Sequence, residues 1–451
     1  MPGSKRLSYL VSGLATGVAI LSAIYLPVEA WDEARRGVNA FEMLQRGDYL
    51  NYYYLGESDT FNTKPPLFLW FAAASFQLFG VHTFTLRLPS LLALAGLLLY
   101  YRHWLAERFG AHIALLTIGA TVSVNGLIGY HVAINGDTDM LFVCLLTVAC
   151  LAYYSFLVET QSSSLLIAVV AAGLAFLTKG VAVVLVVPGL LAFTLSRREY
   201  RRTMVSRRAA GRWLMALAML AGLCLFLSFM GRESYPEGGP DSLLTAMFLR
   251  DGLQRLTDTA FEPVSQPWFV FQALDIRFGP VIYVLYASIP VLLWRFGGGG
   301  LARRLGRDPF TVYSLCLAAS VLLLLQLSSN KHNWYVAPAI PFLAYLFATC
   351  VRGATGSVNA YRWLIVALVS VAIVQRGLTI SSASSEPLPA SVTERLRGAD
   401  DLYIDAQMPQ DDVFRLVEQI PVACRVGVLT AGLPETSEDC FLLDAWRGCI
   451  K

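Results

Sequence analysis

Residues 7–37 read LSYLVSGLATGVAILSAIYLPVEAWDEARRG, an apolar run that is followed at once by Asp32, Glu33, Arg35 and Arg36. The run has about 20 residues, the length that a helix needs to cross the hydrocarbon core of a bilayer. Two carboxylates and two guanidiniums therefore stand at the mouth of a membrane span. Such a cluster needs an explanation, because ionisable groups at membrane depth are costly.

The composition places this span in a polytopic α-helical membrane protein. Of the 451 residues, 56% are hydrophobic and only 15% are charged, and the mean hydropathy is +0.55. These values are too apolar for a soluble chain of this length. The net charge of +3 is nearly neutral and gives no sign of a nucleic-acid partner, so the lipid bilayer is the expected partner.

Eleven apolar runs are long enough to be spans. They lie at about 7–27, 86–106, 111–130, 138–158, 163–178, 180–196, 213–230, 278–296, 310–328, 335–352 and 361–380. A shorter run from Pro66 to Gly80 is typical of an interfacial or re-entrant helix and is left out of the count.

The positive-inside rule orients the eleven spans. Lys5 and Arg6 precede the first run, and no small-residue cleavage site follows before Glu29, so we expect a retained span and a cytoplasmic N-terminus. The basic loops then fall inside: residues 197–212, residues 295–307, and Arg102 with Arg108. Every unusual polar cluster lies outside, which predicts one polar site at the outer face of a bacterial inner membrane.

The chain changes character near residue 381, after which short β and amphipathic patterns follow a Ser- and Pro-rich linker. We therefore expect two domains, a membrane domain over 1–380 and a small extracytoplasmic α/β domain over 381–451. Cys424, Cys440 and Cys449 lie in this tail, where one disulfide would leave one cysteine over, and the sequence leaves the pairing open.

The Asp-Glu pair has two readings. A carboxylate at this position caps the helix that begins near Ala34, and capping needs only one of the two. A carboxylate at the membrane surface is also a ready general base for a hydroxyl, which favours a catalytic role for Asp32 more than for Glu33. Arg35 and Arg36 either neutralise the pair or bind a phosphate.

Several cations share the outer face and are candidates for binding a phosphate. Lys64 precedes two prolines that fix the entry of the short helix, although a lysine there also snorkels. The further candidates are Lys331, Arg250 and Arg255.

Asp137 and Asp139 stand before the fourth span in the motif GDTDM, as an N-cap or as a metal or sugar contact. His131 and His332 are on the same side, but no Cys/His spacing matches a zinc site. The only cofactor that we leave open is a divalent ion at Asp137 and Asp139.

Cations, carboxylates and neighbouring apolar grooves together suit a lipid-linked phosphate: the apolar tail lies in the bilayer, the phosphate meets the lysines and the polar head meets the carboxylates. A lipid transporter or flippase, and a scaffold that binds polyprenyl lipids, are the alternatives. The polar residues cluster on one face and not at the midplane, and no inverted repeat is visible, which disfavours the transporter.

The chain resembles the GT-C membrane glycosyltransferases, in the group of the lipid A aminoarabinose transferase and the protein O-mannosyltransferases. The resemblance covers about residues 7–350 and rests on the order and spacing of six stretches. These are WDEARRGVNAFEMLQRGDYL, NTKPPLFLW, LRLPSLLALAG, GDTDMLFV, GLAFLTKGVAVVLVVPG and SSNKHNWYVAPAIPFLA.

The resemblance implies an inverting transfer of one sugar from a polyprenyl phosphate to an acceptor at the outer face. It implies that Asp32 acts as base with support from Glu33, and that Lys64 holds the donor phosphate. The remaining roles follow the same pattern. Lys331 with Arg250 or Arg255 would share the leaving-group charge, and Asp137, Asp139, His131, His332 and Tyr335 would line the sugar or acceptor pocket.

Two residues depart from the pattern of the family and limit which of its properties are expected for this chain. Thr63 stands where the aminoarabinose transferases have an acidic residue, and Val181 stands where the family usually has proline. The donor sugar therefore stays open, as does the acceptor, for which a lipopolysaccharide, a protein and a polysaccharide are the candidates. Replacing Asp32 with Asn separates an enzyme from a transporter or a scaffold.

Overall fold

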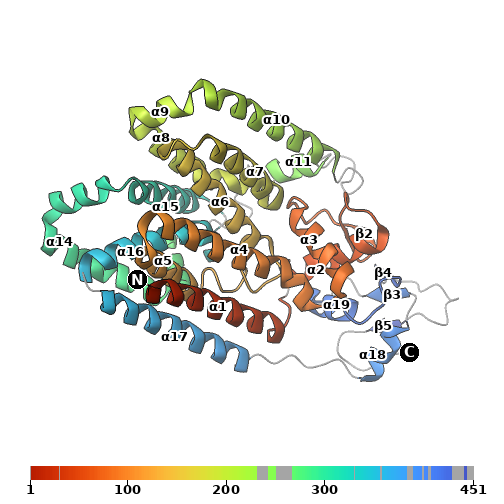
Figure 1. The fold of residues 1–451 in the computed structure, drawn as a ribbon. Helices are drawn as coiled ribbons and strands as arrows, with labels where there is room; N and C mark the ends of the chain where they lie inside the picture. Colours follow the sequence, from red (N-terminus) through yellow and green to blue (C-terminus); the bar gives the residue numbers. More distant parts are fainter. Residues whose placement is uncertain are drawn as a thin grey trace.

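Apolar runs of the sequence become helices throughout a computed structural model of the chain (Figure 1). The structure describes residues 2–29, 31–230, 242–249, 267–329, 331–355, 358–382, 390–398, 401–404, 408–428 and 441–443. Within these residues, eight helices are long and apolar enough to cross a membrane. The prediction of a polytopic α-helical membrane protein is confirmed.

Each of the eleven predicted spans corresponds to a helical segment. Those segments are α1 (Pro2–Tyr25), α4 (Thr83–Phe109), α5 (Ala111–Ser123), α6 (Thr138–Val158), α7 (Ser162–Lys179), η1 (Gly180–Val186) with α8 (Val187–Ser196), α10 (Arg207–Phe229), α14 (Pro280–Arg307), α15 (Pro309–Leu327), η3 (Asn333–Ala339) with α16 (Ile340–Thr355), and α17 (Val358–Ser382). The segments Tyr9–Tyr25 and Ala111–Ser123 are shorter than a full span. The run Ser162–Ser196 counts as one apolar stretch of 35 residues.

That long stretch reverses direction at Lys179. Gly180 has φ +57°, which breaks the α-helix there. The Lys179 ammonium reaches Asp139 at the start of α6, whereas Thr194 hydrogen-bonds Tyr153 near the end of α6. Because α7 follows α6 as its hairpin partner, η1 and α8 run back beside the same helix. The two predicted spans are therefore separate passes.

The predicted span over 111–130 is corrected by the structure. The helix α5 ends at Ser123, and residues 124–137 form turns and irregular backbone until Asp137 caps α6. This segment is buried between helices despite its irregular backbone, so side chains and neighbouring backbone satisfy its polar groups. For example, the N–H of Gly126 donates to the carbonyl of Arg277 at 2.7 Å.

The spans differ in how much protein covers them. The apolar windows of α6 and of η3 with α16 are each 78% buried, whereas those of α10 and α17 are 6% and 17% buried. The interior of the bundle therefore runs along α6 and α16, where Tyr101 of α4 donates a hydrogen bond to the carbonyl of Pro341. The exposed apolar faces of α10 and α17 are left for lipid.

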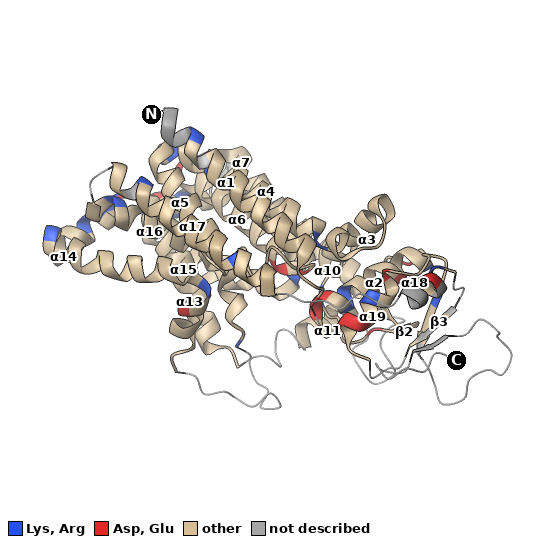
Figure 2. Cartoon of the chain, turned by 90° about the horizontal axis from the view of Figure 1, so that it is seen from below, with Lys and Arg blue, Asp and Glu red and all other residues tan. Residues whose placement is uncertain are grey.

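Most of the short elements gather at one end of the bundle (Figure 1). They are α2 (Asp32–Arg46), β1 (Tyr53–Tyr54), β2 (Glu57–Ser58), α3 (Leu67–Phe79), α11 (Leu243–Ala246), α18 (Ala390–Arg397) and α19 (Gln410–Val417), whereas α13 (Phe269–Phe278) lies beside α15. Acidic residues concentrate around α2 and α19 in Figure 2, while the opposite end carries the basic residues of α14. The short helix α9 (Arg198–Met204) also lies at the basic end.

The tail contains a small parallel sheet, in which β3 (Asp401–Ile404) lies between β4 (Arg425–Val428) and β5 (Phe441–Leu443). Its helix α19 packs on α2, where Phe414 lies against Gly37 and stacks on Phe76 of α3. The division into two domains stays a prediction. Cys424 is buried, and Cys440 and Cys449 lie outside the described residues.

Candidate active site

The helix α2 begins at Asp32, directly after Trp31, whose φ is +67°. A bulky residue rarely adopts this conformation, and such strain clusters at functional sites. Asp32 and Glu33 occupy the first turn, where the helix dipole favours negative charge, and Gly47 ends the helix in the left-handed conformation. The two carboxylates then diverge: the Asp32 side chain is 42% exposed and that of Glu33 is 1% exposed.

Glu33 is held from several directions. It accepts two hydrogen bonds from the Arg87 guanidinium, at 2.6 and 2.9 Å, one from the backbone N–H of Gly136 at 2.6 Å and one from the Asn135 amide at 3.0 Å. The backbone N–H of Glu29 donates to it at 2.8 Å. This carboxylate therefore ties α2 to α4 and to the segment before α6.

Arg36 points into the same site. Its side chain is 7% exposed, and its guanidinium lies 3.1 Å from Asp137 Oδ1 and 3.8 Å from Asp32 Oδ1. Its Nε has no hydrogen-bond partner among the described residues. One buried cation thus faces the two carboxylates that the sequence analysis assigned to the base and to the sugar pocket.

Asp137 caps α6 by accepting from the backbone N–H and, at 3.0 Å, from the hydroxyl of Thr138. Burial opposes ionisation of this carboxyl, but Arg36 and His131 outweigh burial and hold its pKa well below the usual range. Asp137 is therefore a fixed anion at the end of the span.

His131 links two carboxylates. Its Nε2 lies 3.1 Å from Glu29 and its Nδ1 lies 3.4 Å from Asp137. Burial alone would lower the pKa of the imidazole, but Asp137 and Glu29 outweigh burial and raise it. Burial raises the pKa of Glu29 to about 7. The φ of His131 is +64°, a second strained residue at this site.

Oxygen and nitrogen atoms of Asp32, His131 and Asp137 lie within 4.8 Å of one another. Carboxylate and imidazole ligands suit zinc or manganese. A cation there would have to share Asp137 with the Arg36 guanidinium. Asp139, the other residue proposed for a divalent ion, is instead bound to Lys179 at 2.5 Å.

Lys179 connects this acidic end of α6 with the segment 331–335. Its ammonium lies 5.0 Å from the ring centroid of Tyr335, on the aromatic face. Further along, His131 stacks on Trp334 at 4.0 Å, and His332 stacks on Trp334 at 4.4 Å. The structure thus brings the predicted sugar-pocket residues Asp137, Asp139, His131, His332 and Tyr335 together.

Arg277 of α13 fixes the segment 331–335 to the turn before His131. It donates to Asn333 Oδ1 from Nε at 2.8 Å and to the carbonyl of Tyr130 from Nη1 at 2.8 Å. Burial lowers the pKa of Arg277 to about 10. Lys331 is half-buried at the start of the segment. Arg250 and Arg255 lie outside the described residues.

Lys64 is half-buried on the loop that precedes α3. Asp59 shapes this loop through a bidentate pair with Arg35 at 2.8 and 2.9 Å, and Asn39 donates to the same carboxylate at 2.9 Å. The Tyr52 hydroxyl donates to the carbonyl of Lys64 at 2.8 Å. Arg35 is therefore a structural residue of the loop, whereas Arg36 faces the site.

Sequence reasoning left Arg36 undecided and missed Glu29, Arg87, Lys179 and Arg277. The spacing of Glu29 and Glu33, one helical turn apart, was an available signal, as was a charge inside an apolar stretch at Arg87 and Arg277. The partners of Glu33 were hidden, since Arg87 lies 54 residues away.

Sequence comparisons find relatives over most of the chain. The family model described as dolichyl-phosphate-mannose-protein mannosyltransferase matches residues 63–230. The undecaprenyl phosphate-alpha-4-amino-4-deoxy-L-arabinose arabinosyl transferase of Yersinia pestis is 24% identical over 350 residues, 74% of this chain. An uncharacterized protein of Aquifex aeolicus is 24% identical over 333 residues. Each alignment covers 59% of the relative, so the chain spans about three fifths of their length.

Solved structures share the fold. The crystal structure of ArnT from Cupriavidus metallidurans bound to undecaprenyl phosphate matches with a TM-score of 0.67 and 16% identity, over 91% of this chain and 85% of that chain. The Archaeoglobus fulgidus oligosaccharyltransferase in complex with Zn and sulfate matches with a TM-score of 0.58 and 14% identity, over 92% and 62%. The GT-C fold expected from the sequence is confirmed.

Proposed function

We propose, for a chain that has the GT-C fold and resembles the aminoarabinose and mannosyl transferases, that it is an inverting glycosyltransferase. It takes one sugar from a polyprenyl phosphate and transfers it to an acceptor at the outer face of the bacterial inner membrane. The activities after which its relatives are named support the lipid-linked donor. The site remains outside in this proposal, with the N-terminus in the cytoplasm.

The observation that carries the proposal is the half-exposed Asp32 carboxylate beside two buried groups that set its surroundings. Arg36 lies 3.8 Å away and itself pairs with Asp137 at 3.1 Å. Asp32 is thus accessible to a substrate, whereas Glu33 next to it is enclosed by donors. An accessible carboxylate on a rigid helix start is what a general base requires.

At the anomeric carbon the reaction forms one C–O bond and breaks another, and one proton moves from the acceptor hydroxyl to Asp32. Asp32 takes the proton of the acceptor hydroxyl while the hydroxyl oxygen attacks the anomeric carbon from the face opposite the phosphate. The bond from that carbon to the phosphate oxygen breaks, and the polyprenyl phosphate leaves with the electron pair. The configuration at the anomeric carbon is inverted, and the proton ends on Asp32.

The leaving phosphate gains charge as the bond breaks, and cations offset that charge. Lys64 is the proposed primary phosphate ligand, helped by Lys331 and by Arg250 or Arg255. No carboxylic acid is needed to protonate a phosphate that is compensated in this way. The polar residues around Lys179 and Tyr335 would contact the sugar or the acceptor.

Glu33 acts in this proposal as a positioning residue. Its bonds to Arg87 and to the backbone of Gly136 lock the first turn of α2 against the segment that ends at Asp137. A divalent ion at Asp137 stays a candidate cofactor, and no step of the mechanism depends on it. The acceptor is proposed to be a lipopolysaccharide, a protein or a polysaccharide.

The proposal is tested by comparing cells that contain the chain with cells that lack it. Mass spectrometry of envelope glycolipids, polysaccharides and proteins should show one product heavier by a single sugar only when the chain is present. Cells with Asp32→Asn serve as the control that keeps the membrane protein in place. If cells with the chain, cells without it and cells with Asp32→Asn had identical mass profiles while the polyprenyl-linked sugar donor was available, the proposed enzyme activity would be refuted.

A further inference from the structure

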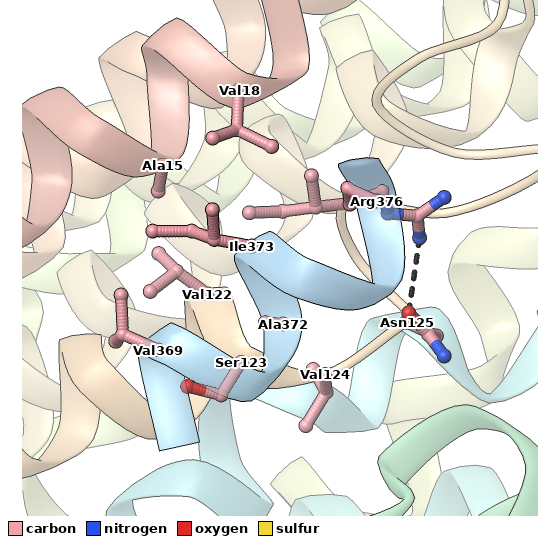
Figure 3. Close-up of a pocket in the computed structure, with 11 residues that line it drawn as sticks. Ala15, Val18, Val122, Ser123, Val124, Asn125, Val369, Ala372, Ile373 and Arg376 are labelled. Atoms are coloured by element: carbon pink, nitrogen blue, oxygen red, sulfur yellow. Dashed lines mark hydrogen bonds between the residues drawn. The ribbon is translucent and has the colours of Figure 1, made fainter. Parts of the chain in front are cut away.

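A small, partly open pocket lies between α1, the end of α5 with the segment after it, and α17 (Figure 3). Its walls are mostly apolar and include Ala15 and Val18 of α1 and Val369 and Ile373 of α17. The polar groups that line it are few, with Arg376 the only charged one. None of the residues assigned to the donor phosphate lines this pocket.

Arg376 is a half-buried cation whose charge is little compensated by its neighbours. It donates to Asn125 Oδ1 at 3.1 Å, a neutral partner. Within the described part of the chain no carboxylate forms an ion pair with it, and Arg277, a second cation, is close enough to repel it. A charge in an apolar wall is costly unless an anion meets it, so the pocket favours a negatively charged ligand.

One wall of the pocket is a helix at the lipid-facing surface of the bundle. Only 17% of the apolar window of α17 is buried inside the protein, and Val371, Val374 and Leu378, on the face turned away from the pocket, are exposed. Arg376 stands six residues before the end of α17 at Ser382, a distance of about 9 Å along the axis. That depth is close to the phosphate and glycerol layer of a bilayer, which a guanidinium can reach.

We propose that this pocket binds an anionic bilayer phospholipid, with its phosphate on Arg376 and one acyl chain along Val18, Val369 and Ile373. The guanidinium presents parallel N–H groups that match phosphate oxygens. The apolar walls give the chain of a lipid a contact that inorganic phosphate could not use. This inference is independent of the proposed transfer reaction.

The position of the pocket connects the lipid to the active site. Asn125 and Ile128 line the pocket, and the same segment continues to His131 and Asp137. A Cβ at Gly129 would lie 1.9 Å from the carbonyl oxygen of Asn125 and 3.0 Å from Arg376 Nη2, so glycine there fits the close approach of the Asn125 backbone beside the guanidinium. A phosphate on Arg376 would therefore rest against the segment that carries His131.

The test uses the full-length chain in detergent, titrated with phosphatidylglycerol and followed by native mass spectrometry. Arg376→Gln should weaken binding of one lipid about tenfold, because a charge-assisted pair is lost. Arg376→Lys should restore most of it. Arg362→Gln, on the same helix at its other end, is the matched control and should leave this affinity unchanged.

A second variant protects the test against misfolding. Ala372→Phe keeps the cation but fills the pocket, and it should also expel the lipid. Unchanged affinity in both Arg376→Gln and Ala372→Phe would overturn the proposal, as would an equal loss in Arg362→Gln. Displacement of the lipid by millimolar inorganic phosphate would show a free-phosphate site and would overturn the assignment to a lipid.

Discussion

Two neighbouring carboxylates of α2 have opposite surroundings, although the sequence presents them as a pair. Glu33 is enclosed by donors from α4 and from the segment before α6, whereas the Asp32 side chain is 42% exposed. An enclosed carboxylate has no lone pair to offer a substrate, and an exposed one does. We therefore assign positioning to Glu33 and proton transfer to Asp32.

The positioning role of Glu33 predicts a stability effect. Glu33→Gln removes one charge from a buried pair and leaves the Arg87 guanidinium uncompensated, which should lower the free energy of unfolding by about 3–5 kcal/mol. Thermal unfolding of the purified protein measures it. Glu57→Gln on the exposed strand β2 is the control, and equal stability of the two variants would contradict the role of Glu33.

The role of Arg36 predicts a shift in pH dependence. Arg36 together with His131 outweighs burial and keeps the pKa of Asp137 low, so Arg36→Gln should raise that pKa and move the acid limb of the rate profile to higher pH. Transfer should also fall at least about tenfold. Arg46→Gln, at the other end of α2, is the control. An unshifted acid limb in Arg36→Gln would show that the guanidinium does not set the charge of the site.

At this scale the sequence predicted the identity of the chemical groups better than their partners. Asp32, Lys64 and Asp137 stand in motifs of their own, next to turns and helix starts, and these are readable along the chain. The long-range partners of Glu33 and Arg36, Arg87 and Asp137, lie about 50 to 100 positions away along the chain. Spacing along one helix carries no information about such pairs, so only the fold revealed them.

The helix α2 also carries a buried acid at its other end. Glu42 accepts from the backbone N–H of Gly56 and pairs with Arg46 at 3.3 Å. This contact holds the hairpin of β1 and β2 against α2. Burial raises the pKa of Glu42 to about 7 from an ordinary value of 4.5, so the fold prefers the protonated carboxyl.

A raised pKa makes this element less stable as pH rises. The stabilisation from protonated Glu42 is fully present below about pH 4.5 and is lost as pH passes through about 7, a change of roughly 3 kcal/mol. Glu42→Gln cannot ionise, so its melting temperature should fall less between pH 5.5 and pH 8 than that of the wild type. Parallel curves for the two proteins would exclude Glu42 as the titrating group.

Helices could be predicted where the length of an apolar run decides them. Where other features decide the structure, the prediction failed. The run 111–130 reads as one span, yet the helix ends at Ser123, because residues 124–137 are apolar enough to be buried without being helical. The runs 163–178 and 180–196 were predicted as two separate spans, and the positive φ of Gly180 breaks the helix between them. The helix α19 packs on α2 through Phe414, which lies against Gly37. These two residues are far apart in the sequence, so no local pattern predicts their contact.

The two ends of the molecule differ in charge. Acidic and basic residues lie together at the end with α2 and α19, whereas the end with α14 carries mainly basic residues (Figure 2). The span count places the basic loops at residues 197–212 and 295–307 on one side. The orientation of those ends across the membrane is a prediction of the positive-inside rule. The domain boundary near residue 381 is likewise a prediction.

The orientation can be measured with single cysteines. Glu57→Cys on β2 should react in intact cells with a maleimide that cannot cross the inner membrane, once the outer membrane is made permeable. Val205→Cys, 80% exposed beside the basic loop, should react only after the inner membrane is opened. The wild-type chain reports the background from its own cysteines. The reverse pattern would place the site in the cytoplasm.

The central claim is that this chain transfers a sugar with Asp32 as its base, and one assay tests it most directly. The purified full-length chain is reconstituted with a radiolabelled polyprenyl-phosphate sugar and the acceptor fraction found by mass spectrometry, and the rate of label transfer is measured. Wild type and Glu57→Gln should transfer alike, and Asp32→Asn should be at least about 100-fold slower. Transfer by Asp32→Asn at the wild-type rate would contradict the claim.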